Sequence, residues 1–142
     1  LSVQENLEIG ITGTPPSDVE SYIYERFPRL KERRTQAGGT LSGGEQQQLA
    51  IARCLMMRPK IIILDEPTEG IMPILVAQIR DEIKTINNRG VSILLVEQNL
   101  KTALKTCDTI YLMEKGKIAH NSSAETLKNN EEVLTRYLGV SH

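Results

Sequence analysis

The sequence predicts an α/β fold with a parallel, doubly wound sheet, and three observations support this prediction. Residues 60–64, with the apolar run Ile-Ile-Ile-Leu, are typical of a fully buried strand in a parallel sheet. Segments with strand character then alternate with segments of helical periodicity. A glycine turn at residues 42–44 opens directly into a helix, ahead of a β-branched run that ends in two carboxylates.

The composition is that of an ordinary globular protein and argues against several functions. The chain has 142 residues, 39% hydrophobic and 25% charged, so it is one domain or a piece of one. A net charge of -1 argues against binding a nucleic-acid backbone, and the lack of Trp argues against base stacking. No apolar run approaches the ~18 residues of a membrane span. Cys54 and Cys107 are isolated, so we expect two reduced thiols.

Two capping-box patterns predict the first helices. Ser2 with Glu5 predicts a short helix, and Ser17 with Glu20 predicts a second one, which Pro28 interrupts. The chain opens on an apolar residue within the first pattern and without an initiator Met, so we expect a segment to precede it.

The later elements follow from periodicity and turn chemistry. Pro59 ends the helix that begins at the glycine turn, and Gly90 ends the helix that Pro73 opens. A hairpin turn is expected at residues 114–117, and Ser123 caps the helix after it. The expected helices cover residues 44–57, 73–87, 100–105, 124–127 and 131–137. The expected strands cover residues 60–64, 91–96, 109–113 and 118–120.

Asp65 and Glu66 are the first candidate functional residues. The carboxyl ends of parallel strands line the ligand crevice of a doubly wound sheet, and adjacent strand residues point to opposite faces. Asp65 can therefore hold Mg²⁺ while Glu66 orients and polarises a water that attacks a γ-phosphate. The alternative is a plain strand exit into a turn, where Asp and Pro are common.

Ser42, Gly43 and Gly44 form the second candidate site. A helix start exposes backbone N–H groups that favour phosphate, and two glycines let phosphate oxygens approach the backbone. Glu45 in the first turn would repel a phosphate and should point away from it. The alternative is simply a capped helix after a flexible loop.

These motifs together resemble the ATPases of the ATP-binding cassette (ABC) family. Residues 41–46, Leu-Ser-Gly-Gly-Glu-Gln, look like the LSGGQ-type signature, and residues 61–66 resemble the Walker B strand. Residues 67–73 fall where the family has its D-loop, and residues 96–99, Val-Glu-Gln-Asn, fall on its switch region. The likeness covers nearly the whole chain, and its details look most like subunits that power import of branched-chain amino acids, or of urea and short amides.

The resemblance implies a role for each matching position. Ser42, Gly43 and Gly44 would contact the γ-phosphate of an ATP held by the opposite subunit. Asp65 would support Mg²⁺, and Glu66 would be the catalytic carboxylate of its own subunit's site.

Two departures from the family pattern stand out. Gln98 takes the place of a switch histidine that contacts the γ-phosphate, and an amide can donate a hydrogen bond there but cannot become a cation. The chain also has no Gly-x-x-x-x-Gly-Lys-Ser/Thr loop to cradle the phosphates. We therefore expect the C-terminal portion of an ATP-binding subunit, which binds ATP poorly by itself.

The resemblance also implies an architecture and partners. Residues 1–58 would form a helical subdomain with the signature helix, and residues 59–142 the C-terminal part of a P-loop NTPase-like core with a helical end. A second ATP-binding subunit and transmembrane permease subunits would be partners at the cytoplasmic face of the plasma membrane, without nucleic acid. An incomplete sheet should expose apolar surface and self-associate. A non-catalytic partner-binding module and a packing scaffold remain alternatives.

Overall fold

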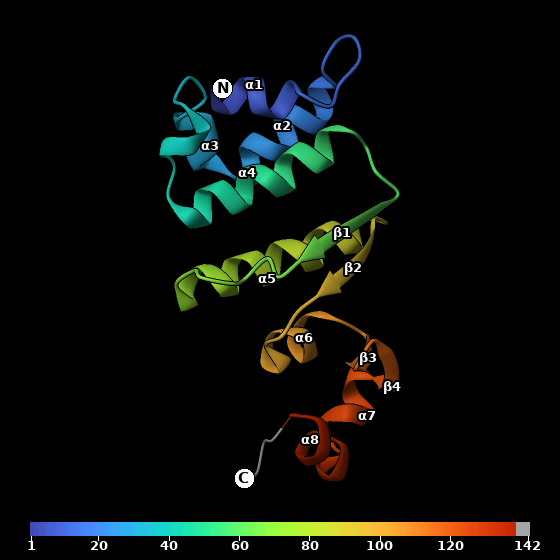
Figure 1. Ribbon diagram of the computed structural model, residues 1–142. Helices are drawn as coiled ribbons and strands as arrows, with labels where there is room; N and C mark the ends of the chain where they lie inside the picture. Colours follow the sequence, from blue (N-terminus) through green and yellow to red (C-terminus); the bar gives the residue numbers. More distant parts are fainter. Residues whose placement is uncertain (139–142) are drawn as a thin grey trace.

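The computed structural model describes residues 1–138 and shows a stack of helices above a short parallel sheet, followed by a hairpin with small helices (Figure 1). The helices are α1 (Val3–Glu8), α2 (Ser17–Arg26), α3 (Pro28–Glu32), α4 (Gly43–Met56), α5 (Pro73–Asn88), α6 (Leu100–Thr106), α7 (Ala124–Lys128) and α8 (Glu131–Leu138), with a 3-10 turn η1 (Gly38–Thr40). The strands are β1 (Ile61–Asp65), β2 (Ser92–Val96), β3 (Thr109–Glu114) and β4 (Lys117–Ser123).

The helix starts test the capping predictions. Ser2 caps α1 in a complete capping box with Glu5, as predicted. The predicted box at Ser17 is wrong, because α2 already begins at Ser17 and Pro16 is its N-cap without a side-chain bond. The backbone carbonyl of Pro16 instead accepts hydrogen bonds from the N–H groups of Val19 and Glu20, at 3.0 and 2.9 Å. Pro28 separates α2 from α3, as predicted.

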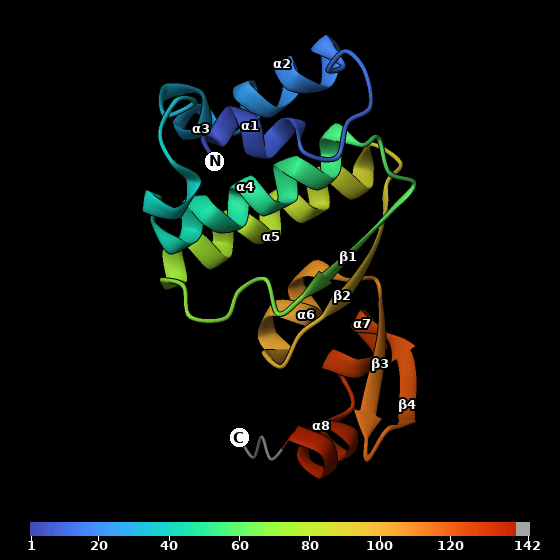
Figure 2. The ribbon, with the colours of Figure 1, turned by 45° about the horizontal axis from the view of Figure 1, so that its top comes forward.

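The main hydrophobic core surrounds α4. Helices α1, α2 and α3 lie on one side of α4 and α5 lies on the other (Figure 2). Apolar side chains of these helices and of β1 belong to one buried cluster. Burial of this much apolar surface is the main source of stability for such a small layered structure. The buried members include Val3, Leu7, Ile23, Leu30, Leu49, Ile51, Ala52, Ile62, Leu64, Ile79, Ile83 and Ile86.

The parallel sheet consists of β1 and β2, which pair in register from Ile61 opposite Ser92 to Asp65 opposite Val96. The prediction of a fully buried strand at residues 60–64 is wrong. Side chains alternate across the strand, so Ile62 and Leu64 face the core while Ile63 is 65% exposed. Helices cover one face of this pair only, and the other face presents Ile61, Ile63, Leu94 and Val96.

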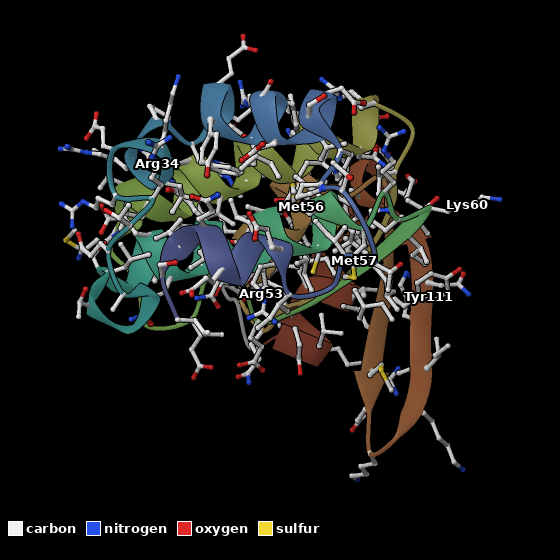
Figure 3. The ribbon with its side chains drawn as sticks, turned by 90° about the horizontal axis from the view of Figure 1, so that it is seen from above. Arg34, Arg53, Met56, Met57, Lys60 and Tyr111 are labelled. Atoms are coloured by element: carbon white, nitrogen blue, oxygen red, sulfur yellow. The ribbon has the colours of Figure 1, made fainter. Side chains whose placement is uncertain are left out.

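The predicted hairpin is present, and it forms a sheet of its own. β3 pairs antiparallel with β4, and within residues 1–138 it has no hydrogen-bonded pairing with β1 or β2. Seen from above, the hairpin that carries Tyr111 projects away from the stack formed by α1 to α5 (Figure 3). A second cluster of buried side chains, Ile110, Ala124, Leu127 and Leu134, joins it to α7 and α8.

Three further features concern the chain as a whole. Cys54 and Cys107 are free thiols, as predicted. No helix among residues 1–138 combines the length and apolar character that crossing a bilayer requires. The predicted division at residues 58 and 59 stays a prediction.

Candidate functional site

Asp65 and Glu66 lie where the parallel strand pair ends, next to the segment that leaves β2. The backbone N–H of Glu66 donates to the carbonyl of Val96 at 2.9 Å, which continues the pairing one residue beyond β1. Glu66 then leaves the strand direction with a φ of 47°, in the left-handed region that residues other than glycine seldom adopt. The structure therefore places the predicted carboxylates at the carboxyl edge of the sheet, where parallel folds bind ligands.

The side chains of the two predicted catalytic residues, Glu66 and Gln98, contact each other. Gln98 Nε2 donates a hydrogen bond of 2.5 Å to Glu66 Oε1. A bond between an amide donor and a carboxylate is charge-assisted and fixes the orientation of the acceptor. The amide of Gln98 is thus directed at the carboxylate of its own chain. Its other N–H and its carbonyl oxygen remain available to a ligand.

Asp65 fits a metal-binding role by its chemistry. Its side chain is exposed at the strand tip, and its carboxylate accepts no hydrogen bond from residues 1–138. No three potential ligands of the His, Cys, Asp or Glu type gather in this part of the chain, so Asp65 could hold Mg²⁺ only together with phosphate oxygens and water.

Several acidic side chains lie close to Glu66 at the end of β1. A hydrogen bond with the Glu66 carboxylate raises the pKa of the Glu69 carboxyl, and the negative charges of Glu66, Glu97 and Asp65 act in the same direction. Like charges that crowd together disfavour further ionisation and attract a cation. The negative charge at this edge would therefore favour a cation over an anion.

Two residues at this edge, Thr68 and Glu97, received no individual role from the sequence. The hydroxyl of Thr68 is buried and donates to Glu97 Oε2 at 2.6 Å, while the backbone N–H of Asn99 donates to Glu97 Oε1 at 3.1 Å. Only the general rule that parallel strands end at the same edge could have indicated that Thr68 and Glu97 would meet.

The second candidate site is the start of α4. Ser42 is the N-cap, its Oγ accepts from the N–H of Glu45 at 3.4 Å, and Glu45 Oε2 accepts from the N–H and hydroxyl of Ser42 at 2.9 Å each. The backbone N–H of Ser42 lowers the pKa of Glu45, and the Ser42 hydroxyl and the Arg33 guanidinium add to this effect. The Glu45 carboxylate is thus turned back onto the cap residue.

Gly43 and Gly44 differ in their surroundings. Gly43 is exposed, and a Cβ built on it would lie 3.9 Å from the side chain of Ile71. Gly44 is buried, and a Cβ there would come within 2.4 Å of Leu75 Cδ1. The absence of a side chain at Gly44 therefore also serves the packing of α4 against α5, while Ser42 and Gly43 remain open to a ligand.

The glycines of the second candidate site have apolar side chains as their nearest neighbours. The side chains next to Gly43 and Gly44 are Ile71 and Leu75, which lie on the segment that runs from Glu66 into α5 (Figure 2). Neither Asp65 nor Glu66 is among these neighbours. The interpretation of a ligand shared between two subunits stays a prediction.

A short parallel sheet that ends in two carboxylates, next to a helical layer with a capped diglycine helix start, is the arrangement expected from the resemblance to ABC ATPases. Comparisons with known proteins support this resemblance: residues 2–69, just under half of the chain, match the family model described as ABC transporter. The chain is 45% identical over 142 residues to the high-affinity branched-chain amino acid transport ATP-binding protein BraG of Pseudomonas aeruginosa, covering 98% of this chain and 61% of BraG.

Further relatives give the same class. The lipopolysaccharide export system ATP-binding protein LptB of Haemophilus influenzae is 37% identical, over 98% of this chain and 60% of LptB. The probable branched-chain amino acid transport protein LivF of Archaeoglobus fulgidus is 36% identical, over 99% of this chain and 61% of LivF. The solved cassette MJ1267 superimposes with a TM-score of 0.81 at 25% identity, over 99% of this chain and 63% of MJ1267. The chain thus spans about three-fifths of the length of these relatives.

Proposed function

We propose that the chain is the C-terminal portion of an ATP-hydrolysing subunit of an ABC importer. It would supply the signature, Walker B and switch segments, and a segment outside these 142 residues would supply the phosphate-binding loop. The observation that carries the proposal is the 2.5 Å hydrogen bond between Gln98 and Glu66 beside the free carboxylate of Asp65.

In this proposal the chain's own residues divide the chemistry. Glu66 accepts a hydrogen bond from the attacking water and orients it, and Gln98 holds the Glu66 carboxylate in place. Asp65 would hold Mg²⁺, which neutralises charge on the phosphates when it is bound. Ser42 and Gly43 would donate hydrogen bonds to the γ-phosphate of the nucleotide on a second subunit.

The transported substrate belongs to the same proposal. The relatives BraG and LivF are described as branched-chain amino acid transport proteins, and the 45% identity to BraG exceeds the 37% identity to LptB. This favours import of branched-chain amino acids, with urea or short amides as the alternative. The partners would be a second ATP-binding subunit and permease subunits, which places the protein at the cytoplasmic face of the plasma membrane.

The test is ATP turnover by the complete subunit and by the 142-residue chain alone. We expect turnover in the complete subunit only, and a reduction of about 10²–10⁴-fold with Glu66→Gln, the range typical of a positioned acid–base group. Glu114→Gln, at the exposed end of β3, is the matched control and should leave turnover unchanged. Turnover that Glu66→Gln does not alter would refute the assigned role.

A measurement of ATP affinity, made beside the turnover assay, separates a non-catalytic partner-binding module from an enzyme. Such a module would lend Ser42 and Gly43 to a nucleotide held by another protein. ATP affinity would then appear when a partner with a phosphate-binding loop is added, without hydrolysis that depends on Glu66.

A further inference from the structure

Glu97 uses both of its carboxylate oxygens to hold neighbouring segments together. Oε2 accepts from the hydroxyl of Thr68 at 2.6 Å, and Oε1 accepts from the backbone N–H of Asn99 at 3.1 Å. Thr68 is only 8% exposed, so its hydroxyl has lost most of its contact with water and needs a protein acceptor. A carboxylate suits this place because it offers two acceptor oxygens and no competing donor.

The contacts of Glu97 continue into α6. Asn99 is the N-cap of this helix, and its Oδ1 accepts from the backbone N–H of Thr102 at 3.0 Å. Thr68, Glu97 and Asn99 therefore connect the turn after β1 to the start of α6. Gln98 lies between Glu97 and Asn99 in the chain, so both of its neighbours in sequence are fixed.

We propose that Glu97 is a positioning residue that places the backbone of Gln98 so that Gln98 Nε2 meets Glu66 Oε1. The inference deepens the proposed function, on which its kinetic consequence rests. A bond of 2.5 Å between two side chains that are 32 positions apart requires both turns to be held relative to each other. The Glu66 turn is tied to the β2 exit by the bond from its N–H to Val96 and by the bond from Thr68 to Glu97.

The first test uses the 142-residue chain and needs no hydrolysis. The solvent-exchange rate of the Gln98 Nε2 protons, measured by NMR, reports the bond to Glu66. Thr68→Val keeps the shape of the side chain but removes the hydroxyl, and Glu97→Ala removes both acceptors. We expect exchange at Gln98 to become about 10-fold faster in each, as for the loss of a charge-assisted hydrogen bond.

Matched variants separate positioning from general destabilisation. Thr68→Ser retains the hydroxyl, so exchange of the Gln98 protons should remain slow. Thr85→Val removes a comparable hydroxyl bond, 2.8 Å to the carbonyl of Asp81 on α5, and should leave Gln98 unchanged. If Glu97→Ala does not fold, Thr68→Val decides the question. Slow exchange at Gln98 that persists in a folded Thr68→Val variant overturns the proposal.

The second test is kinetic and uses the complete subunit. Displacement of Gln98 should lower kcat by about 10–100-fold with little change in KM for ATP, because the interaction affects the reacting geometry and not nucleotide binding. A higher KM with an unchanged kcat would overturn the positioning role. Absence of turnover in the unsubstituted subunit would refute the proposed function instead, and the exchange result would stand independently.

Discussion

Arg26 on α2 donates two hydrogen bonds to one carboxylate oxygen of Glu82 on α5, from Nε at 2.9 Å and from Nη2 at 2.7 Å. The Glu82 side chain is 6% exposed, and its other oxygen accepts from the Tyr22 hydroxyl at 3.3 Å. The guanidinium of Arg89 lies 3.9 Å from the centroid of the Tyr22 ring. The hydrogen bonds from Arg26 and Tyr22 to Glu82 connect α2 to α5, the helix that follows Glu66.

Removing Arg26 should destabilise the fold measurably. Arg26→Ala leaves the buried Glu82 carboxylate with only the Tyr22 hydroxyl, and such an uncompensated charge is costly. The Arg26 side chain is 39% exposed, so water can partly replace it, and we expect a loss of about 2 kcal/mol in the free energy of unfolding. Urea denaturation measures it. Arg29→Ala, which breaks an exposed pair with Glu32 (side chains 64% and 57% exposed), should have no measurable effect, and an equal loss in both variants would contradict the assignment.

The two signature glycines should respond differently to alanine. Gly44→Ala places a Cβ 2.4 Å from Leu75 Cδ1, the end of a half-buried side chain that must shift, so we expect overpacking partly offset by helix propensity and a net loss of about 0.5–1 kcal/mol. Gly43→Ala meets nothing closer than 3.9 Å and should be neutral or slightly stabilising, because alanine favours the helix. Thermal unfolding compares the two. Recovery of Gly44→Ala by a second change, Leu75→Ala, would identify the contact, and equal effects of the two single variants would argue against it.

The capping box at Ser42 should make stability depend on pH. Hydrogen bonds from Ser42 lower the pKa of Glu45 in the folded chain, so its stabilising effect is complete above the pKa of the unfolded state, about 4.3. It is lost as the pH falls through the lower, folded value. Because glutamine can also complete a capping box, Glu45→Gln removes only the negative charge, and we expect a cost of about 0.5 kcal/mol at neutral pH and none in strong acid. Urea denaturation over a pH series checks this. Glu125→Gln is the control, because Glu125 lies in the first turn of α7 but is not part of a capping box, and its cost should not change over the same pH range as that of Glu45→Gln. A cost of Glu45→Gln that does not depend on pH would exclude the mechanism.

The uncovered face of the parallel sheet should cause the 142-residue chain to self-associate. Ile61, Ile63, Leu94 and Val96 form an exposed apolar surface next to two strand edges. We expect light scattering to show a mass that rises with concentration, and Ile63→Lys to lower it. Ile74→Lys changes an equally exposed isoleucine on α5, at 67% against 65%, and should not. A monomer at high concentration would contradict this prediction.

Local signals made much of the fold predictable. The capping box at Ser2, the N-cap at Ser42, the left-handed Gly90 after α5 and the hairpin turn before β4 are each encoded within a few residues, and all are present. The cap at Ser17 failed because an extended Pro16 provides the same helix start through its carbonyl, which the sequence pattern does not distinguish.

Contacts between distant residues were not predictable in the same way. The position of β3 outside the parallel sheet depends on which strands pair, and the exposed face of β1 depends on which face of the sheet the helices cover. The pairs Thr68–Glu97 and Arg26–Glu82 join residues 29 and 56 positions apart, and no local pattern reports them. The motifs around Asp65, Glu66 and Gln98 predicted that these residues lie at one edge of the sheet, whereas no motif indicated the contacts of Thr68 and Glu97 that connect this edge.

The left-handed backbone at Glu66 has a consequence for how this position can vary. Glutamate adopts that conformation at a cost of about 1 kcal/mol, whereas glycine adopts it readily. Truncating the side chain to glycine would thus remove the carboxylate and relax the turn at once, while β-branched replacements would strain the turn further. Selection for heat resistance would thus favour glycine at position 66, whereas selection for turnover would favour glutamate.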